Sequence, residues 1–255
     1  MNPEPAGRPF LTVVVPAYNE ERRLGASLER IAGWLESRGI DGELVVVDDG
    51  SSDGTARVAA DQLKGRRGRV LRQPENRGKG AAVRRGVLEA HGRWVLLSDA
   101  DLSSPIEEYD TLAAAARERD ADVAIGSRGL PESKVEVRQN LVRQTMGKTF
   151  NLAIRTMTGL PFRDTQCGFK LMDRERVRPL FEKMVVDRFA FDVEFLFLCR
   201  KFGLAVVEVP VVWRNAPGSK VSIFRDPLNM LADVARVRWR FRRGRYNPEA
   251  TAPRA

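Results

Sequence analysis

The stretch Val95–Asp101, with the sequence VLLSDAD, decides the fold class that we predict for this chain. Its apolar residues are typical of a buried strand, which ends in Asp99 and Asp101, two positions apart. Side chains at i and i+2 of an extended chain point the same way, so we expect both carboxylates to converge at the carboxyl end of the strand. Ligands of open α/β sheets bind at that edge, and paired carboxylates suit a divalent cation that also holds a diphosphate. A turn whose aspartates cap the next helix is the alternative.

The residues around this stretch alternate between strand-like and helix-like patterns. We expect strands at 11–15 (ended by Pro16), 43–47, 69–72, 94–98 and 122–126. We expect one helix from 24 to near Gly39, a second that follows the turn at 48–55 and ends at 62, a third from about 79 to 90 and a fourth from 105 to 119. Such alternation indicates βαβ units and a mostly parallel sheet flanked by helices. Because crossovers are right-handed, the polar loops at 16–20, 48–53 and 99–103 should share one edge of that sheet.

The second half is less regular. We expect helices at 138–157, 174–184 and 192–202, a loop and strand over 162–173, and a strand at 204–213 with Pro210 at an edge or bulge. No linker interrupts the chain, so we predict a single domain over 10–225. Residues 1–9 and 246–255 are expected to be flexible.

The terminal segment 226–245 is strongly basic. Asp226-Pro227 is typical of a helix start, and an amphipathic helix would place these apolar residues on one face: Met230, Val234, Val237 and Phe241. Arginines fill the remainder: Arg236, Arg238, Arg240, Arg242, Arg243 and Arg245. The run also alternates with period two, so a strand stays open. A basic amphipathic helix suits an anionic membrane surface, whereas a packed helix with a solvated basic face is the alternative.

The composition is that of a globular chain with an anionic partner. It has 255 residues, 43% of them apolar, with a formal charge of +9. This charge favours nucleic acid, a membrane surface or a phosphorylated substrate, although arginines on solvated helix faces also explain part of it. Few aromatic residues interleave with the basic run and no DNA-binding motif appears, which argues against nucleic acid.

The lack of a recognisable targeting signal and the small number of cysteines predict a reducing compartment. No stretch reaches the roughly 18 apolar residues of a membrane span, and residues 1–9 lack the apolar region of a signal peptide. The two cysteines are too few for a disulfide framework. We therefore expect a cytoplasmic protein.

Four motifs stand in the order found in the inverting family 2 glycosyltransferases, which the chain resembles: VVVPAYNE at 13–20, VDDGSSDGT at 47–55, NRGKG at 76–80 and SDAD at 98–101. The resemblance implies the A-type nucleotide-sugar transferase fold. Further stretches are similar to the dolichyl-phosphate β-glucosyltransferase and polyprenyl-phosphate sugar synthase branch: GSR at 126–128, DTQCGFK at 164–170, RFAFDVE at 188–194 and VPVVW at 209–213. The resemblance implies a nucleotide-sugar-binding half at 10–126 and an acceptor-side half at 127–225.

The resemblance also implies a donor site. The matching nucleotide-sugar-binding positions are Pro16, Ala17, Tyr18, Glu20, Asp48, Asp49, Gly78, Lys79, Asp99 and Ala100. A carboxylate can accept the uracil imide N–H, and Asp49 is the better candidate, with an Asx-capped turn as the alternative. By analogy Asp99 approaches the ribose and the metal, Asp101 binds the metal directly and Ser103 completes the coordination. Mg²⁺ or Mn²⁺ is expected, and would neutralise the departing diphosphate.

On the acceptor side the resemblance assigns Arg128, Arg143 and, less clearly, Arg138 to the acceptor phosphate, and Arg214 and Lys220 to a diphosphate clamp. A phosphate monoester with a second pKa of about 6 is already an anion at neutral pH, so it can attack without a strong base. An alcohol acceptor would need a carboxylate base, for which Asp164 or Asp192 is available. With a phosphate acceptor these two would position groups, and Asp192 could simply cap a helix.

We therefore expect an inverting enzyme that moves glucose or another hexose from a UDP-sugar to a polyprenyl or dolichyl phosphate at the inner face of a membrane. Relatives in eukaryotes carry an amino-terminal membrane anchor, which we do not find here; the basic terminal segment would replace it. Two alternatives stay open: a soluble family 2 enzyme with a sugar or small phosphorylated acceptor, and a non-enzymatic binder of anionic surfaces or nucleic acid.

Overall fold

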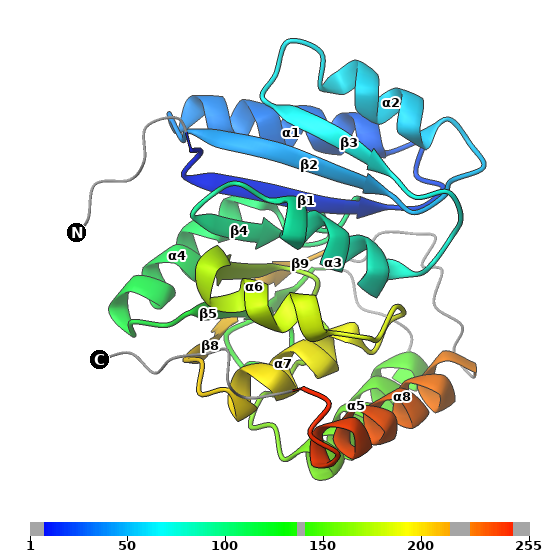
Figure 1. Cartoon of the computed structure of the whole chain (residues 1–255). Coiled ribbons are helices and arrows are strands. Elements are labelled where there is room, and N and C mark those ends of the chain that lie inside the picture. The colour runs from blue at the N-terminus through cyan, green and yellow to red at the C-terminus, as the bar shows by residue number, and fades with distance from the viewer. Residues whose placement is uncertain (1–7, 137–140, 215–224, 247–255) are drawn as a thin grey trace.

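A seven-stranded, mostly parallel sheet forms the centre of the molecule (Figure 1). The computed structural model describes residues 8–136, 141–214 and 225–246, without the side chains of 141–149 and 225–227. The strands lie in the order β3 (Gly68–Arg72), β2 (Gly42–Asp48), β1 (Leu11–Ala17), β4 (Trp94–Leu97), β7 (Lys170–Asp173), β5 (Val123–Ser127), β8 (Val206–Pro210). Only β7 runs antiparallel to its neighbours, β4 and β5. The mostly parallel sheet expected from the sequence is confirmed.

Helices cover both faces of the sheet, because alternate residues of the buried strands point to opposite sides. One face packs against α1 (Leu24–Ser37), α2 (Thr55–Gln62), the short 3-10 helix Ile106–Glu108 and α4 (Tyr109–Glu118). The other packs against α3 (Lys79–Glu89), α6 (Arg174–Lys183) and α7 (Phe191–Lys201). In β1, for example, Val13 and Val15 belong to the first layer and Val14 to the second.

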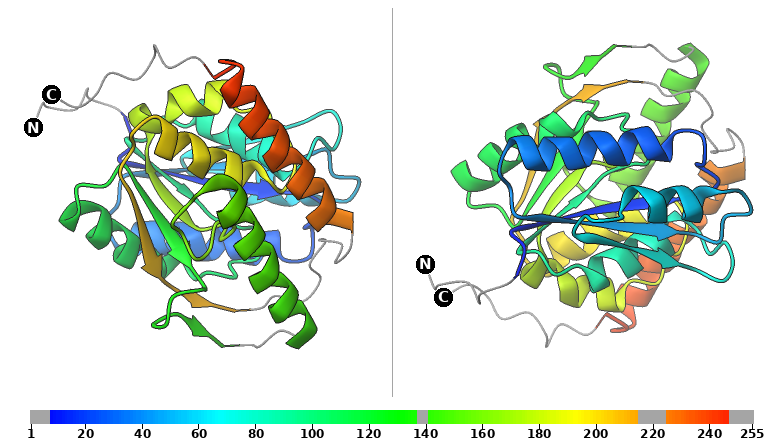
Figure 2. Two further views of the ribbon diagram at one scale, coloured as in Figure 1. Left: turned by 90° about the horizontal axis from the view of Figure 1, so that it is seen from below. Right: turned by 90° about the horizontal axis from the view of Figure 1, so that it is seen from above.

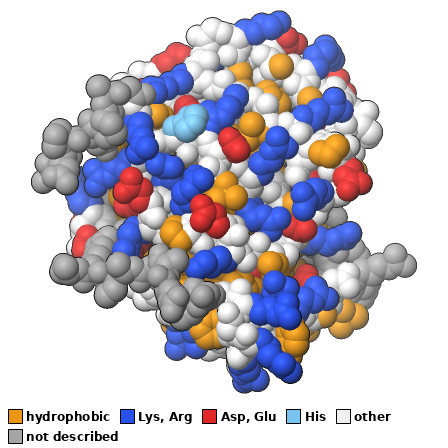
Figure 3. Space-filling view, viewed as in Figure 1, with side chains coloured by type: hydrophobic (Ala, Val, Ile, Leu, Met, Phe, Trp, Pro, Cys, Tyr) orange, Lys and Arg blue, Asp and Glu red, His pale blue; other side chains and the backbone are white. Residues whose placement is uncertain are grey.

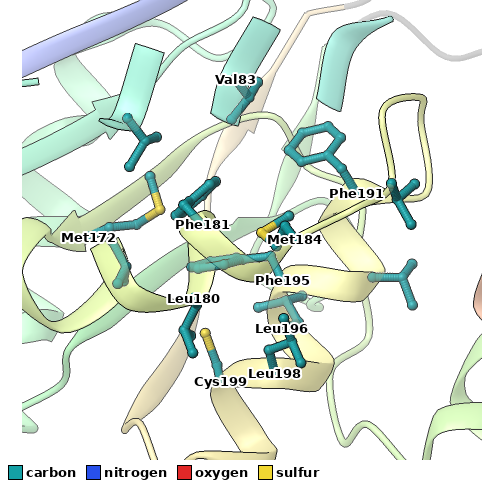
Figure 4. Close-up of a cluster of buried hydrophobic side chains, with 14 of the residues drawn as sticks. Val83, Met172, Leu180, Phe181, Met184, Phe191, Phe195, Leu196, Leu198 and Cys199 are labelled. Carbon is teal, nitrogen blue, oxygen red and sulfur yellow. The ribbon is translucent and has the colours of Figure 1, made fainter. Parts of the chain in front are cut away.

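Figure 4 shows a cluster of buried apolar side chains in the layer over β7. Phe181 of α6 and Phe195 of α7 have ring centroids 5.0 Å apart and are both 1% exposed. Met172 of β7 packs beneath them. This layer fixes α7, whose first turn reaches the functional edge of the sheet.

Two long helices, α5 (Leu141–Thr158) and α8 (Arg225–Arg242), lie side by side outside this layer (Figures 1 and 2). Met230, Val234 and Val237 of α8 are buried, so the apolar face predicted for the terminal segment packs on the core. The period-two alternative is wrong, since this segment is helical. A small second sheet pairs β6 (Lys134–Val135) with β9 (Val212–Trp213).

Several predicted boundaries differ from the structure. Strand β1 continues through Pro16 to Ala17, because its pairing with β4 ends at Val14 and only β2 accompanies it further. The strand expected over 204–213 is divided between β8 and β9. Pro105 is extended, with ψ 145°, so helical structure starts after it. Residues 1–7, 137–140, 215–224 and 247–255 lie outside the described part of the chain, so predictions that fall there are not tested.

Two helix glycines test the packing of α3 on the sheet. A Cβ on Gly86 of α3 would come within 2.4 Å of the Val14 side chain and 3.1 Å of Val47, whereas Gly33 of α1 has nothing within 4 Å. Gly86→Ala should lower the free energy of unfolding by about 1–3 kcal/mol through overpacking, as measured by urea denaturation. Gly33→Ala should raise it by up to about 1 kcal/mol, because alanine favours the helix. Equal effects at both positions would contradict the packing described here.

Candidate active site

Hydrogen bonds from backbone N–H groups to side-chain oxygens join the loops that follow β1 and β2. The Asn19 N–H donates to Ser51 Oγ at 2.9 Å, the Ser52 N–H donates to Asn19 Oδ1 at 2.9 Å, and the Glu20 N–H donates to Thr55 Oγ1 at 2.7 Å. Asn19 sits at φ 51°, a left-handed conformation that asparagine tolerates. For the loops at 16–20 and 48–53, the prediction of a shared edge is thus confirmed.

Asp48 and Asp49 are both buried at the end of β2. Asp48 Oδ1 accepts the Ser51 N–H at 3.0 Å, and its Oδ2 lies 3.3 Å from the Arg72 guanidinium. The contact between Asp48 and the Ser51 N–H corresponds to the Asx-capped turn expected from the sequence as the alternative.

Asp49 organises the segment that leads into α3. Its carboxylate accepts hydrogen bonds from the side-chain amides of Gln73 (2.5 Å) and Asn76 (3.0 Å) and from the N–H groups of Arg77 (2.9 Å) and Gly78 (2.8 Å). Burial raises the pKa of Asp49 although these donors oppose it. A carboxylate has about four lone-pair positions, so a uracil N–H would have to displace one of the two side-chain amides.

Asp99 and Asp101 lie in a turn beyond β4, not in an extended strand. The Leu102 N–H donates to Asp99 O at 3.1 Å, and Leu102 has φ 47°. The alternation argument that placed both carboxylates on one side is therefore wrong, since β4 already ends at Leu97. Asp101 Oδ1 accepts the Ser103 N–H at 2.9 Å, and its Oδ2 is 3.7 Å from the Arg23 guanidinium.

Asp99 is held by the first residue of α3. Lys79 Nζ donates to Asp99 Oδ1 at 2.6 Å. Burial disfavours the charged carboxylate, but Lys79, with Lys170 and Arg128 further away, keeps the pKa of Asp99 below its usual range. Asp99 is therefore ionised at neutral pH.

Arg128 and Asp164 form a bidentate pair in the second half of the chain. Arg128 Nε and Nη2 donate to Asp164 at 2.6 Å and 3.0 Å, and the Arg128 N–H donates to the same carboxylate at 3.0 Å. Although burial opposes ionisation, Arg128 lowers the pKa of Asp164 to about 2. The guanidinium also lies 5.5 Å from the Trp213 ring. Because a guanidinium has five N–H donors, it can hold Asp164 and still bind an anion.

Lys170 is a site residue that the sequence prediction missed. It opens β7, where it pairs with Leu97 and Ile125 of the neighbouring strands. An antiparallel strand begins where its parallel neighbours end, so Lys170 enters the functional edge from the second half of the chain. The available signal was the lysine that ends the DTQCGFK motif at 164–170, directly before the apolar residues Leu171 and Met172.

Lys170 forms a buried ion pair with Asp192. Its Nζ donates to Asp192 Oδ1 at 2.6 Å and to the Cys167 carbonyl oxygen, and the two residues are 1% and 4% exposed. Burial raises the pKa of Asp192 although Lys170 lowers it. Asp192 does not cap α7, whose N-cap is Ala190. The capping alternative is therefore wrong.

Gly168 brings the loop before β7 against the tip of β4. A Cβ on Gly168 would come within 2.2 Å of Asp99 Oδ2, so only a glycine allows this approach. The Asp99 carboxylate thus lies directly against the segment that carries Asp164 and Lys170.

Most of the remaining predicted site residues lie around the same loops, but the Arg214 side chain does not. Pro16, Ala17, Ala100 and Ser103 are buried around the same loops, Tyr18 is half-buried, and the Glu20 carboxylate binds Arg23. Arg214 does not point into this cluster: its side chain pairs with exposed Glu136 at 2.7 Å, while its N–H donates to Ser103 O. Arg138, Lys220 and the Arg143 side chain lie outside the described part of the structure.

The donor set at the tip fits a hard cation that is held mainly by its substrate. Among the described residues, no three His, Cys, Asp or Glu side chains form a group that could hold a metal ion. Mg²⁺ commonly uses one or two carboxylates together with substrate phosphates. Asp101 and Asp99 supply ligands of that kind, and the Ser103 N–H donates to Asp101.

The comparisons with known proteins agree with this arrangement. The model of the family "Glycosyl transferase family 2" matches residues 12–181, and the chain belongs to this family. It is a glycosyltransferase.

Among curated relatives, the chain is 40% identical to a dolichyl-phosphate β-glucosyltransferase of Drosophila melanogaster, over 88% of this chain and 73% of that protein. It is 33% identical to the Homo sapiens protein of the same name, over 94% and 78%.

Solved structures support the A-type fold that the resemblance implied. Mannosyl-3-phosphoglycerate synthase from Rubrobacter xylanophilus superposes with a TM-score of 0.67 at 22% identity, covering 97% of this chain and 78% of that one. Glucosyl-3-phosphoglycerate synthase from Mycobacterium tuberculosis, in complex with Mn²⁺, UDP-glucose and glycerol 3-phosphate, superposes with a TM-score of 0.62 at 23% identity. This match covers 91% of this chain and 79% of that one. Within the described residues, we find no helix long and apolar enough to cross a membrane.

The Arg128–Asp164 pair gives a pH-dependent prediction. The depressed pKa of Asp164 contributes stability that is present above the unfolded value of 3.8 and is lost as the pH falls toward about 2. A shift of this size corresponds to about 2–3 kcal/mol. Asp164→Asn should therefore lower the free energy of unfolding at pH 7 by about that amount, with the difference from the unmodified protein shrinking below pH 4.

The exposed pair of Arg67 and Asp41, at 2.7 Å, provides the control. Asp41→Asn should lower the free energy of unfolding by less than about 1 kcal/mol, because surface ion pairs contribute little to stability. Denaturation in urea between pH 2 and 7 measures both variants, and a pH-independent loss in Asp164→Asn would contradict the prediction.

Proposed function

We propose that this chain is an inverting enzyme that transfers glucose from UDP-glucose to a polyprenyl or dolichyl phosphate. The observation that carries the proposal is the set of three buried or half-buried ion pairs at one edge of the sheet: Asp99–Lys79, Asp164–Arg128 and Asp192–Lys170. The relatives named dolichyl-phosphate β-glucosyltransferase cover both halves of the chain that contribute these pairs.

The donor nucleotide would lie over the joined loops after β1 and β2. Asp49 and the segment that it organises provide an acceptor for the uracil N–H, and Pro16, Ala17 and Tyr18 form the wall beside it. The positively charged Lys79, at the amino end of α3, would attract the diphosphate, since a helix amino terminus favours anions.

A divalent cation would be held by Asp101 and Asp99, with Ser103 as a further oxygen ligand. When bound, it supplies charge neutralisation for the departing UDP. Arg23, 3.7 Å from Asp101, would orient that carboxylate.

The state of the carboxylates favours a phosphate as the acceptor. Asp164 and Asp192 each bind a cation and are almost fully buried, so neither is poised to take a proton from an alcohol. A phosphate monoester needs no such base because it is already anionic. Arg128 would bind that phosphate, together with Arg143 and Arg138 as the sequence predicts. Lys220 and Arg214 remain candidates for the diphosphate clamp.

We also propose that the enzyme works at a membrane surface, on its cytoplasmic side, because a polyprenyl phosphate resides in the bilayer. The arginine-rich segment that contains α8 would provide the attraction to anionic lipids.

An acceptor assay tests the proposal. Purified protein with UDP-glucose and Mg²⁺ or Mn²⁺ should form a β-linked lipid phosphate glucose from a polyprenyl phosphate, detected by mass spectrometry. The same mixture with 3-phosphoglycerate should give no product. Transfer to 3-phosphoglycerate without lipid product would instead favour the soluble alternative, and UDP-independent DNA binding without any transfer would favour the non-enzymatic one.

Asp101→Asn tests the metal assignment. The catalytic efficiency (kcat/KM) should fall by about 100-fold or more, because an amide is a weak ligand for a hard cation. A fall of this size corresponds to about 3 kcal/mol of transition-state stabilisation. UDP binding should lose its dependence on Mn²⁺ in calorimetry. Asp110→Asn, on α4 in an exposed pair with Arg38, is the control and should retain both properties. Metal-dependent UDP binding in Asp101→Asn would reject this assignment.

A further inference from the structure

Helix α8 has a second apolar stripe, on the side opposite its buried residues. Leu228 is 71% and Trp239 49% exposed, and their separation of eleven positions makes about three helical turns, which places both on one face. Ala232 and Ala235, also exposed, lie between them on that face. The helix therefore presents apolar residues outward as well as inward.

Arginines flank this outward stripe on both sides. By the helical period, Arg236 lies along one side of it, and Arg238 and Arg242 lie along the other. The neighbouring helix α5 adds exposed Leu152, which is 62% exposed. Figure 3 shows Lys and Arg side chains gathered over this lower part of the molecule, with apolar side chains among them.

Arg238 and Arg242 also line a pocket. It has a volume of about 210 Å³, and Lys201, Thr158, Phe197 and Phe241 complete its lining. Lys201 Nζ lies 5.5 Å from the centroids of both phenylalanine rings. No ion pair joins Lys201, Arg238 or Arg242 to a carboxylate in the described part of the chain, so three uncompensated cations surround this hollow.

We propose that this surface, formed by the outward stripe of α8 and the pocket of Lys201, Arg238 and Arg242, docks on an anionic lipid bilayer. The stripe lies in the interfacial layer, where tryptophan is favourable, and a lipid phosphate occupies the pocket, where two guanidinium groups and an ammonium bind it. A second copy of the chain fits less well, because a two-fold interface would bring these like charges together.

The pocket is separate from the transfer site. Lys201 ends α7 and Asp192 lies in its first turn, which puts them about 13 Å apart along the helix. The pocket therefore takes a phosphate of the bulk lipid and not the acceptor phosphate. The inference deepens the proposed function by naming the surface that meets the membrane, and it is tested without donor or acceptor.

Vesicle sedimentation of the full chain provides the test. Binding to phosphatidylcholine vesicles with about one-third phosphatidylglycerol should exceed binding to pure phosphatidylcholine by tenfold or more. The double variant Arg238→Gln/Arg242→Gln should lose at least tenfold of that affinity. Arg117→Gln/Arg119→Gln, which removes the same charge at the end of α4, should bind like the unmodified protein.

Tryptophan fluorescence tests the stripe. Lipids brominated in their acyl chains should quench part of the emission of the unmodified protein, and Trp239→Phe should abolish that quenching while the protein still binds the vesicles. Quenching that survives in Trp239→Phe would overturn the placement of the stripe.

Three other results would overturn the proposal. These are equal vesicle affinity of both double variants, binding of inorganic phosphate to the pocket without vesicle binding, and a concentration-dependent dimer that Trp239→Ala abolishes. Turnover with a short-chain, water-soluble polyprenyl phosphate should be unchanged in Arg238→Gln/Arg242→Gln. Absence of that turnover in the unmodified protein would count against the proposed function, whereas vesicle binding alone decides the docking surface.

Discussion

A carboxylate that is withdrawn from water has to meet a cation or a set of N–H donors, and pairing with cations shapes the functional edge of the sheet. Asp164 and Asp192 are almost completely buried, and Asp164 pairs with Arg128 while Asp192 pairs with Lys170. An unpaired charge at either position would cost several kcal/mol, and removal of one partner of such a pair typically destabilises a protein by about 3–5 kcal/mol. The carboxylates that the basic residues neutralise therefore also hold them in position. This places several positive groups at the edge of the sheet where the proposed function requires phosphate binding.

The site joins two parts of the chain that are far apart in sequence. Asp99 follows β4, in the first half, and is held by Lys79 of the same half. Gly168, in the second half, lets the backbone come against the Asp99 carboxylate. Because β7 runs against its neighbours, its first residue and the loop before it arrive at the edge where β4 ends. Asp99 and the ion pairs Asp164–Arg128 and Asp192–Lys170 are thereby brought together at one edge of the sheet.

Much of this arrangement could be predicted from the sequence, since apolar runs and polar loops alternate clearly before residue 127. The five early strands, the loops that share an edge and the buried face of α8 all follow from residue periodicity. The turn at Asp99–Leu102 could not be predicted in this way, because it depends on a residue in a left-handed conformation that no glycine announces. Lys170 escaped because its burial depends on Asp192, and a pair separated by 22 positions leaves no local pattern. The outward stripe of α8 contains two alanines, which a search for large apolar residues passes over.

The place of β7 in the sheet has a consequence for how the chain reaches its folded state. Strand β4 is flanked on one side by β1, but its other neighbour is β7, whose residues 170–173 are made long after Leu97. During synthesis on the ribosome, one side of β4 therefore stays without a partner until much of the second half has emerged. An unpaired strand edge of this kind invites association with other chains. A nascent chain of this architecture thus depends on late residues, or on chaperones, to protect the centre of its own sheet.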